Sequence, residues 1–98
     1  MPDKPVGWKF VRFLEVLDRW GKIETPSVDL RIIVADWVTE QMVSPYRGMR
    51  REPGFDNLWF GPIPGTRAGW SVVTCSYFVY ERERIVRCND ICTLENVP

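Results

Sequence analysis

The second half of the chain contains three apolar segments that lie too close together for helices to fit between them. They are rich in β-branched and aromatic residues and cover residues 57–63 (NLWFGPI), 70–80 (WSVVTCSYFVY) and 84–94 (RIVRCNDICTL). Proline and glycine separate the first two segments, and the charged tripeptide ERE separates the last two. Strands joined by connections this short pair in antiparallel fashion. The sequence therefore predicts a three-stranded antiparallel meander.

The first half of the chain has helical periodicity instead. Phe13, Val16, Leu17 and Trp20 follow the i, i+3, i+4, i+7 spacing of an amphipathic helix, which we expect to end at Gly21. Residues 8–13 (WKFVRF) alternate weakly and indicate a short strand before this helix, although a single helix over residues 8–20 also fits.

A second helix is predicted from the capping sequence at residues 25–27 (TPS) to about Met42, with Ser44-Pro45 ending it. The residues expected on its buried stripe are Leu30, Ile33, Val34, Trp37, Val38 and Met42. Those expected to face solvent are Arg31, Asp36, Glu40 and Gln41.

These elements predict one α+β domain over residues 1–98. Its N-terminal strand and two helices pack on a small antiparallel sheet that ends in the meander. Residues 45–56 (PYRGMRREPGFD) form an irregular segment between the helices and the sheet, and segments of this length are often functional. Disorder is expected only at residues 1–5 and after Leu94.

The formal net charge is zero and the isoelectric point is about 6.2, which argues against bulk electrostatic binding of nucleic acid. One local patch departs from this balance, because residues 42–51 (MVSPYRGMRR) carry three arginines and no acid. Arginine suits phosphate or an acidic partner, since its planar fork makes paired hydrogen bonds.

The chain has three cysteines and no histidine. An odd cysteine count, no signal-peptide pattern and no apolar stretch of membrane length predict a reduced, cytoplasmic protein that does not enter a membrane. On one strand Cys88 and Cys92 would share a face roughly 13 Å apart, too far to pair. We expect the cysteines to be small core residues and no metal or cofactor to bind, since phosphate-loop and dinucleotide motifs are also absent.

Without histidine, the Ser–His and Cys–His nucleophilic systems are excluded. Any acid–base chemistry must use carboxylates, Lys, Tyr, Cys or backbone groups.

The order strand, short helix, longer helix and three-stranded meander resembles the RelE/ParE superfamily of toxins from toxin–antitoxin systems. FLEVLDRW (residues 13–20) is similar to the early helix of RelE/HigB-like proteins, and the helix over residues 28–42 is similar to their second helix. LWFGPIPGT followed by WSVVTCSYFVYERERIVRC is similar to their strand, turn and hairpin. The resemblance covers about residues 8–94.

The resemblance implies a small cytoplasmic toxin with an antitoxin partner. Such toxins either cleave mRNA on the ribosome or inhibit a host protein such as gyrase. In the ribonuclease members Arg and Lys neutralise the phosphate, and a C-terminal Tyr or His, or a Glu, handles the proton. This chain departs from that pattern, because its tail (ENVP) has neither Tyr nor His and Trp70 stands where an arginine is expected.

As catalytic residues we therefore predict Arg50, Arg51 and Arg67 for phosphate, with Tyr77 or Tyr80 near the reaction. As residues that bind phosphate or a partner we predict Tyr46, Arg47 and Arg87.

Strand periodicity adds two expectations about the sheet. A spacing of three places Tyr77 and Tyr80 on opposite faces, one in the core and one exposed. The same rule separates Asp90 from Arg87 and turns Asp90 toward the helices, which is costly for a carboxylate and indicates a register error, a β-bulge or a site.

A non-catalytic interaction module is the alternative function. It would bind a host protein through the exposed sheet face and the segment at residues 45–56, and a phage or mobile element would be a natural source for it.

Overall fold

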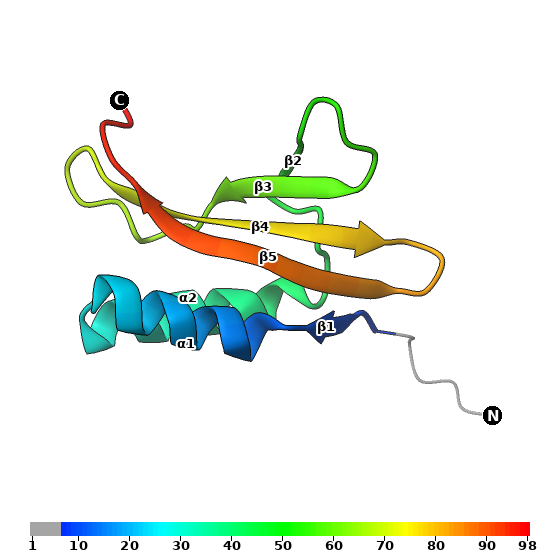
Figure 1. Ribbon diagram of the computed structural model, residues 1–98, viewed down its shortest axis with the longest axis horizontal. Coiled ribbons are helices and arrows are strands. Elements are labelled where there is room, and N and C mark those ends of the chain that lie inside the picture. The colour runs from blue at the N-terminus through cyan, green and yellow to red at the C-terminus, as the bar shows by residue number, and fades with distance from the viewer. Residues whose placement is uncertain (1–6) are drawn as a thin grey trace.

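The computed structural model describes residues 7–98, so the disorder expected at residues 1–5 lies outside the described part of the chain. Two helices and five strands make up the fold (Figure 1). In chain order they are β1 (Lys9–Val11), α1 (Phe13–Glu24), α2 (Val28–Gln41), β2 (Arg50–Arg51), β3 (Leu58–Pro62), β4 (Val72–Tyr80) and β5 (Ile85–Leu94).

The sheet has the strand order β1-β5-β4-β3-β2, and both helices lie on one side of it (Figure 1). The predicted α+β class and the predicted meander, formed by β3, β4 and β5, are both confirmed. Two details differ from the prediction. Strand β1 pairs with β5 in parallel, so the sheet is mixed, and the segment at residues 45–56 contributes the short edge strand β2.

Helix α1 has the predicted buried residues but does not end at Gly21. The helix continues to Glu24, because the Gly21 carbonyl still accepts the backbone N–H of Thr25 at 3.1 Å. Thr25 adopts the left-handed conformation, with φ of 46°, that ends the helix instead.

The predicted start of α2 is confirmed, since the Ser27 hydroxyl accepts the backbone N–H of Leu30 at 3.1 Å. Its buried stripe differs from the prediction at four positions, and at the first of these Leu30 is half-buried. Ile33 and Met42 are 36% and 40% exposed, whereas Gln41, expected to face solvent, is only 1% exposed. Gln41 is buried because its amide donates to the Tyr77 hydroxyl at 3.0 Å and to a backbone carbonyl.

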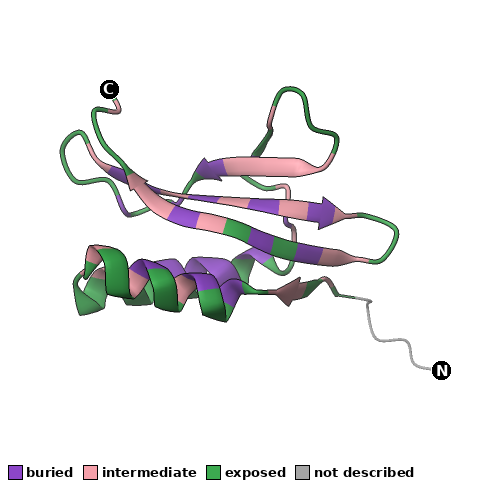
Figure 2. Cartoon of the chain, in the orientation of Figure 1, coloured by how far each residue is buried: buried purple, intermediate pink, exposed green. Residues whose placement is uncertain are grey.

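The core lies between the helices and the sheet. Along β4 the side chains alternate between buried and half-buried (Figure 2), as expected for a strand with one covered face. The residues of β4 that contribute to the core are Val73, Cys75, Tyr77 and Val79, and Val72 at the start of the strand is buried as well. From the helices, the buried hydrophobic side chains packed against it are Phe13, Val16, Trp20, Val34, Trp37 and Val38.

A β-bulge in β5 changes which face its second half presents. Ser76 of β4 pairs with Asp90 and Tyr77 pairs with Cys88, so Asn89 is an extra residue without a partner in the ladder. Beyond the bulge, Asp90 and Cys92 lie on the open face of the sheet. The expectations that Asp90 faces the helices and that Cys88 and Cys92 share a face were therefore wrong, because an extra residue reverses the alternation.

The C-terminal tail is held in place, contrary to the expectation of disorder after Leu94. The backbone N–H of Val97 donates to the Trp70 carbonyl at 2.8 Å. The Val97 carbonyl accepts a hydrogen bond from the Arg67 guanidinium at 2.9 Å. These contacts fix the tail beside the connection that leads into β4.

Gly61 in β3 allows the 48–49 segment to pack closely on the sheet. A Cβ at this position would lie 2.6 Å from the Gly48 carbonyl oxygen and 2.9 Å from the Met49 sulfur. We expect Gly61→Ala to lower the free energy of unfolding by about 1–3 kcal/mol, since the clashing carbonyl belongs to the backbone. Urea unfolding measures the loss, and Gly7→Ala, where a Cβ meets nothing within 4 Å, is the control. Equal stability of the two variants would contradict this view of the packing.

Candidate functional site

The open face of the sheet carries a row of four side chains from four strands. Arg50 of β2 pairs with Phe60 of β3, Phe60 pairs with Ser76 of β4, and Ser76 pairs with Asp90 of β5. Paired residues project from the same face of a sheet. The row therefore places a guanidinium near one edge of this face and a carboxylate near the other.

A groove of about 380 Å³ lies along this face. Arg50 and Arg67 both line it, so the fold brings together two of the three arginines that the sequence predicts for phosphate. The other lining residues are Phe60, Gly61, Pro62, Val72, Thr74, Cys75, Ser76, Asp90, Cys92, Leu94 and Val97. An apolar floor with a few convergent polar groups is typical of a ligand site.

Hydrogen bonds to the backbone fix the position of Arg67. One terminal nitrogen of its guanidinium donates to the Val97 carbonyl at 2.9 Å and to the Gly69 carbonyl at 3.3 Å. Because both acceptors are neutral, these contacts orient the guanidinium without cancelling its charge. The C-terminal tail thus positions a cation at the groove.

Asp90 is the only carboxylate among the strand residues, and an arginine from the helix layer neutralises it. The Arg19 guanidinium on α1 lies 3.2 Å from the Asp90 carboxylate. None of the ion pairs within residues 7–98 involves Arg50, Arg67 or Arg87. The open face therefore carries arginines that no carboxylate neutralises.

The zero net charge conceals a separation of charge between the two layers. The helices contain six acidic residues, Glu15, Asp18, Glu24, Asp29, Asp36 and Glu40, against the three basic residues Arg19, Lys22 and Arg31. The five strands contain four basic residues, Lys9, Arg50, Arg51 and Arg87, against Asp90 alone. The inference from net charge against nucleic-acid binding therefore does not apply to the sheet side of this molecule.

Cys75 and Cys88 are buried, whereas Cys92, which lines the groove together with Cys75, is only half-buried. The prediction of core cysteines thus holds for Cys75 and Cys88. Burial raises the pKa of the Cys92 thiol, and the nearby carboxylates of Asp90 and Glu24 act in the same direction. Cys92 is therefore a neutral thiol at pH 7, not a thiolate nucleophile.

A second group of side chains occupies the other end of the same face, next to the β4–β5 turn. The Arg87 guanidinium lies 5.3 Å from the centre of the Phe78 ring and 5.8 Å from that of Tyr80. These distances are those of cation–π contacts. Tyr80 is half-buried on the open face, as the strand periodicity predicted for one of the two tyrosines.

Tyr77, the other tyrosine, lies in the core and is completely buried. Its hydroxyl accepts from the Gln41 amide and donates to the Pro45 carbonyl. Burial raises the pKa of this phenol well above its usual value. Both hydrogen-bonding directions of the hydroxyl are occupied, so we leave Tyr77 out of the candidate site.

Three other predicted residues lie away from the groove. Arg51 follows Arg50 in β2 and pairs with Trp59, so its side chain projects from the opposite face. Arg47 is exposed near α2, where its carbonyl accepts the Gln41 amide. Tyr46 packs against Trp8 and Trp59, with ring centres 5.9 and 4.8 Å away.

The Tyr46 hydroxyl donates to Glu81 in the β4–β5 turn. Burial, together with the nearby carboxylate, raises the pKa of Tyr46 to about 12. Its ring contacts with Trp8 and Trp59 join the N-terminal strand to β3 and explain Tyr46 as a packing residue.

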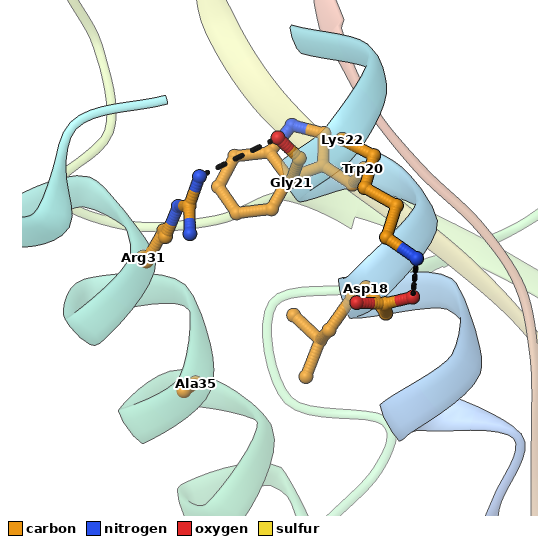
Figure 3. A pocket seen from close by; sticks show the side chains of 7 residues that line it. Asp18, Trp20, Gly21, Lys22, Arg31 and Ala35 are labelled. Carbon is orange, nitrogen blue, oxygen red and sulfur yellow. Dashed lines mark hydrogen bonds and ion pairs between the residues drawn. The ribbon is translucent and has the colours of Figure 1, made fainter. Parts of the chain in front are cut away.

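A cavity of about 410 Å³ between the ends of α1 and α2 is a weaker candidate. Figure 3 shows Arg31 reaching from α2 toward the Gly21 carbonyl, which it meets at 3.5 Å. Lys22 is paired with Asp18 at 3.0 Å. The Lys22 ammonium in this cavity is thus neutralised by a carboxylate, whereas no carboxylate pairs with Arg50 or Arg67 of the groove within residues 7–98.

Comparison of the chain with protein-family models, curated proteins and solved structures finds no significant match. Neither helix of the described part of the chain has the length and apolar character needed to cross a bilayer. Within residues 7–98, no three His, Cys, Asp or Glu side chains gather closely enough to hold a metal ion.

The sequence interpretation missed Asp90 and Cys92 as residues of the groove. The signal available was the predicted burial of an aspartate on an otherwise apolar strand, which indicated a register error, a β-bulge or a site without deciding among them. Only the pairing across β4 and β5 locates that bulge at Asn89 and turns both side chains to the open face.

Proposed function

We propose that this chain is a RelE/ParE-like toxin of a toxin–antitoxin system and that it cleaves mRNA bound on the open face of its sheet. The arrangement of a short strand, two helices on one side and a three-stranded meander supports the family. One observation above all supports RNA as the ligand. Arg50 and Arg67 line one groove, and no carboxylate pairs with either within residues 7–98.

The chemistry of the groove suits attack by a ribose 2′-hydroxyl on the neighbouring phosphate, which forms a 2′,3′-cyclic phosphate and breaks the bond to the 5′-oxygen of the next nucleotide. The 2′-hydroxyl gives up its proton to an acceptor, and the departing 5′-oxygen takes a proton from water. Negative charge grows on the phosphate oxygens in the transition state, and the guanidinium groups of Arg50 and Arg67 stabilise it. The Arg67 guanidinium is already oriented by its hydrogen bonds to the backbone. The proton acceptor must be a group other than histidine. Asp90 lines the same groove and has a side chain 48% exposed, so it is accessible to a hydroxyl of bound RNA.

Induced expression in bacteria, with total RNA sampled after induction, tests this function. We expect growth arrest and shortened mRNA. Arg50→Ala should lower the rate of cleavage by about 100-fold or more, because it removes a transition-state cation. Arg51→Ala is the matched control, since it removes the same charge from the neighbouring residue of β2 on the opposite face.

Three outcomes would contradict RNA cleavage. Equal loss of cleavage in Arg50→Ala and Arg51→Ala would show that the effect is one of overall charge. Growth arrest with intact RNA would point to a protein target such as gyrase. Normal growth would favour the non-catalytic interaction module.

One observation favours that module as a second candidate. The helices expose several apolar side chains, including Leu14 at 84%, Ile23 at 73% and Ile32 at 53%. A groove of about 470 Å³ runs between α1 and α2 beside Leu14 and Met42. Surfaces of this kind mark protein–protein contacts. A stable complex with a host protein, without RNA cleavage, would establish this function.

A further inference from the structure

The Arg87 guanidinium lies within cation–π distance of two aromatic rings on an exposed surface. It pairs with Phe78 in the β4–β5 ladder, and its guanidinium lies 5.3 Å from the centre of that ring and 5.8 Å from the centre of Tyr80. The Arg87 side chain is exposed, while both rings are half-buried beneath it. None of the ion pairs among residues 7–98 neutralises this guanidinium.

This group continues the face that carries the groove. Ser76 lines the groove, and Phe78 and Tyr80 follow it on β4 at every second residue. Same-face neighbours on a strand lie roughly 7 Å apart, so Tyr80 is roughly 14 Å beyond Ser76. Phe60 and Leu58 on β3 pair with Ser76 and Phe78 and extend the apolar floor between the two places.

We propose that Arg87, Phe78 and Tyr80 form a second subsite, which stacks an unpaired nucleobase of the RNA strand whose phosphate lies at Arg50 and Arg67. This inference rests on the proposed function and specifies its substrate as single-stranded RNA that extends past the groove toward the β4–β5 turn. The two half-buried rings contact the guanidinium from the sheet, and because the Arg87 side chain is exposed, a base can reach it from solvent. Stacking on arginine planes and aromatic rings is how proteins hold single-stranded RNA.

The subsite discriminates against duplex RNA for a physical reason. Bases in a duplex are already stacked on one another and paired, so none is free to lie on Arg87. Arginine also serves here better than lysine, because a planar guanidinium stacks and an ammonium does not.

Fluorescence anisotropy with labelled, non-cleavable RNA of three and of eight nucleotides tests the subsite at constant salt. Wild type should bind the longer strand more tightly. Arg87→Ala and Arg87→Lys should each weaken binding of the longer strand by about 5- to 100-fold, the value of one stacked base. Both should leave the three-nucleotide strand unchanged, whereas Arg50→Ala weakens both lengths. Arg82→Ala, which removes a charge from the exposed β4–β5 turn, is the control and should change neither.

Scanning the longer strand with abasic nucleotides identifies the stacked base. At one position, loss of the base should weaken binding to wild type but not to Arg87→Lys. Wild-type affinity in Arg87→Lys would overturn stacking, because charge alone would then suffice. Tight binding without dependence on length or bases would overturn the subsite and leave the proposed function standing. No binding of either strand would overturn both.

Discussion

Glu24→Ala is expected to lower the free energy of unfolding by about 2–4 kcal/mol, because one carboxylate serves three donors and hydrogen bonds to charged groups are the strong ones. One of its oxygens accepts the Trp20 indole N–H at 3.0 Å and the Thr93 hydroxyl. The other accepts the backbone N–H of Thr93 at 3.0 Å. Trp20 is only 3% exposed, so the indole N–H would lose its partner without gaining water.

Glu24 is the last residue of α1, where a negative charge is unfavourable, so its contacts must also offset this cost. An acid in the last turn of a helix opposes the helix dipole, which by itself costs about 0.3–1 kcal/mol. The alanine variant relieves that cost, so the expected loss is a net value. Thr93 lies in the part of β5 that β1 does not cover. Glu24 therefore also accepts the backbone N–H of Thr93 at an edge of β5 that no other strand covers. Without Glu24, this N–H could pair with a strand of a second chain.

Urea or thermal unfolding measures the change, and Glu15→Ala is the matched control. Glu15 lies in the same helix with its side chain 70% exposed, paired only with Arg12 at 3.7 Å, so its loss should stay within about 0.5 kcal/mol. A loss of 2 kcal/mol corresponds to a fall of about 8–16 °C in Tm for a domain of this size. Similar stability in both variants would show that Glu24 does not hold α1 to β5.

The secondary structure could be predicted because its periodicity is strong in the sequence. The three apolar segments became β3, β4 and β5, and the capping residues at 25–27 marked the start of α2. The errors arose where a tertiary contact overrides a local rule. Gln41 is buried because its amide meets the Tyr77 hydroxyl, which is distant in the sequence. Gly21 is a different case, because its carbonyl still accepts a helical hydrogen bond and Thr25 takes the left-handed conformation that ends α1.

The candidate site was harder to predict, because it depends on which face each side chain takes. Arg50 and Arg51 are adjacent arginines that the sequence alone does not distinguish, yet only Arg50 lines the groove. Arg87 and Asp90 share the open face only because Asn89 is an extra residue in β5. A single inserted residue reverses every later side chain on a strand, and no alternation pattern in one sequence reveals which residue is extra.

Net charge was misleading for a related reason. The sum over the chain is zero, but the helices carry an excess of acid and the strands an excess of arginine. The field near a surface depends on the charges of that surface, and distant charges are screened beyond about 8–10 Å. A neutral protein of this kind can therefore present one face to a polyanion and the other to a different partner.

Tyr77→Phe separates a structural tyrosine from a catalytic one. We expect the free energy of unfolding to fall by about 1–3 kcal/mol, because the buried Pro45 carbonyl loses its donor and the Gln41 amide loses one of its two acceptors. The ring itself remains packed against Phe10 and Phe13. RNA cleavage per folded molecule should be unchanged, because the hydroxyl does not reach the groove.

The pH dependence of stability gives a second measure of the same residue. Burial raises the pKa of the Tyr77 phenol, so the folded protein holds this proton more tightly than the unfolded chain. The resulting stability is complete below the unfolded value of about 10 and is lost as pH rises beyond it. Tyr77→Phe should therefore reduce the alkaline loss of stability, because phenylalanine has no proton to lose. Loss of cleavage in Tyr77→Phe with wild-type stability would instead return Tyr77 to the active site.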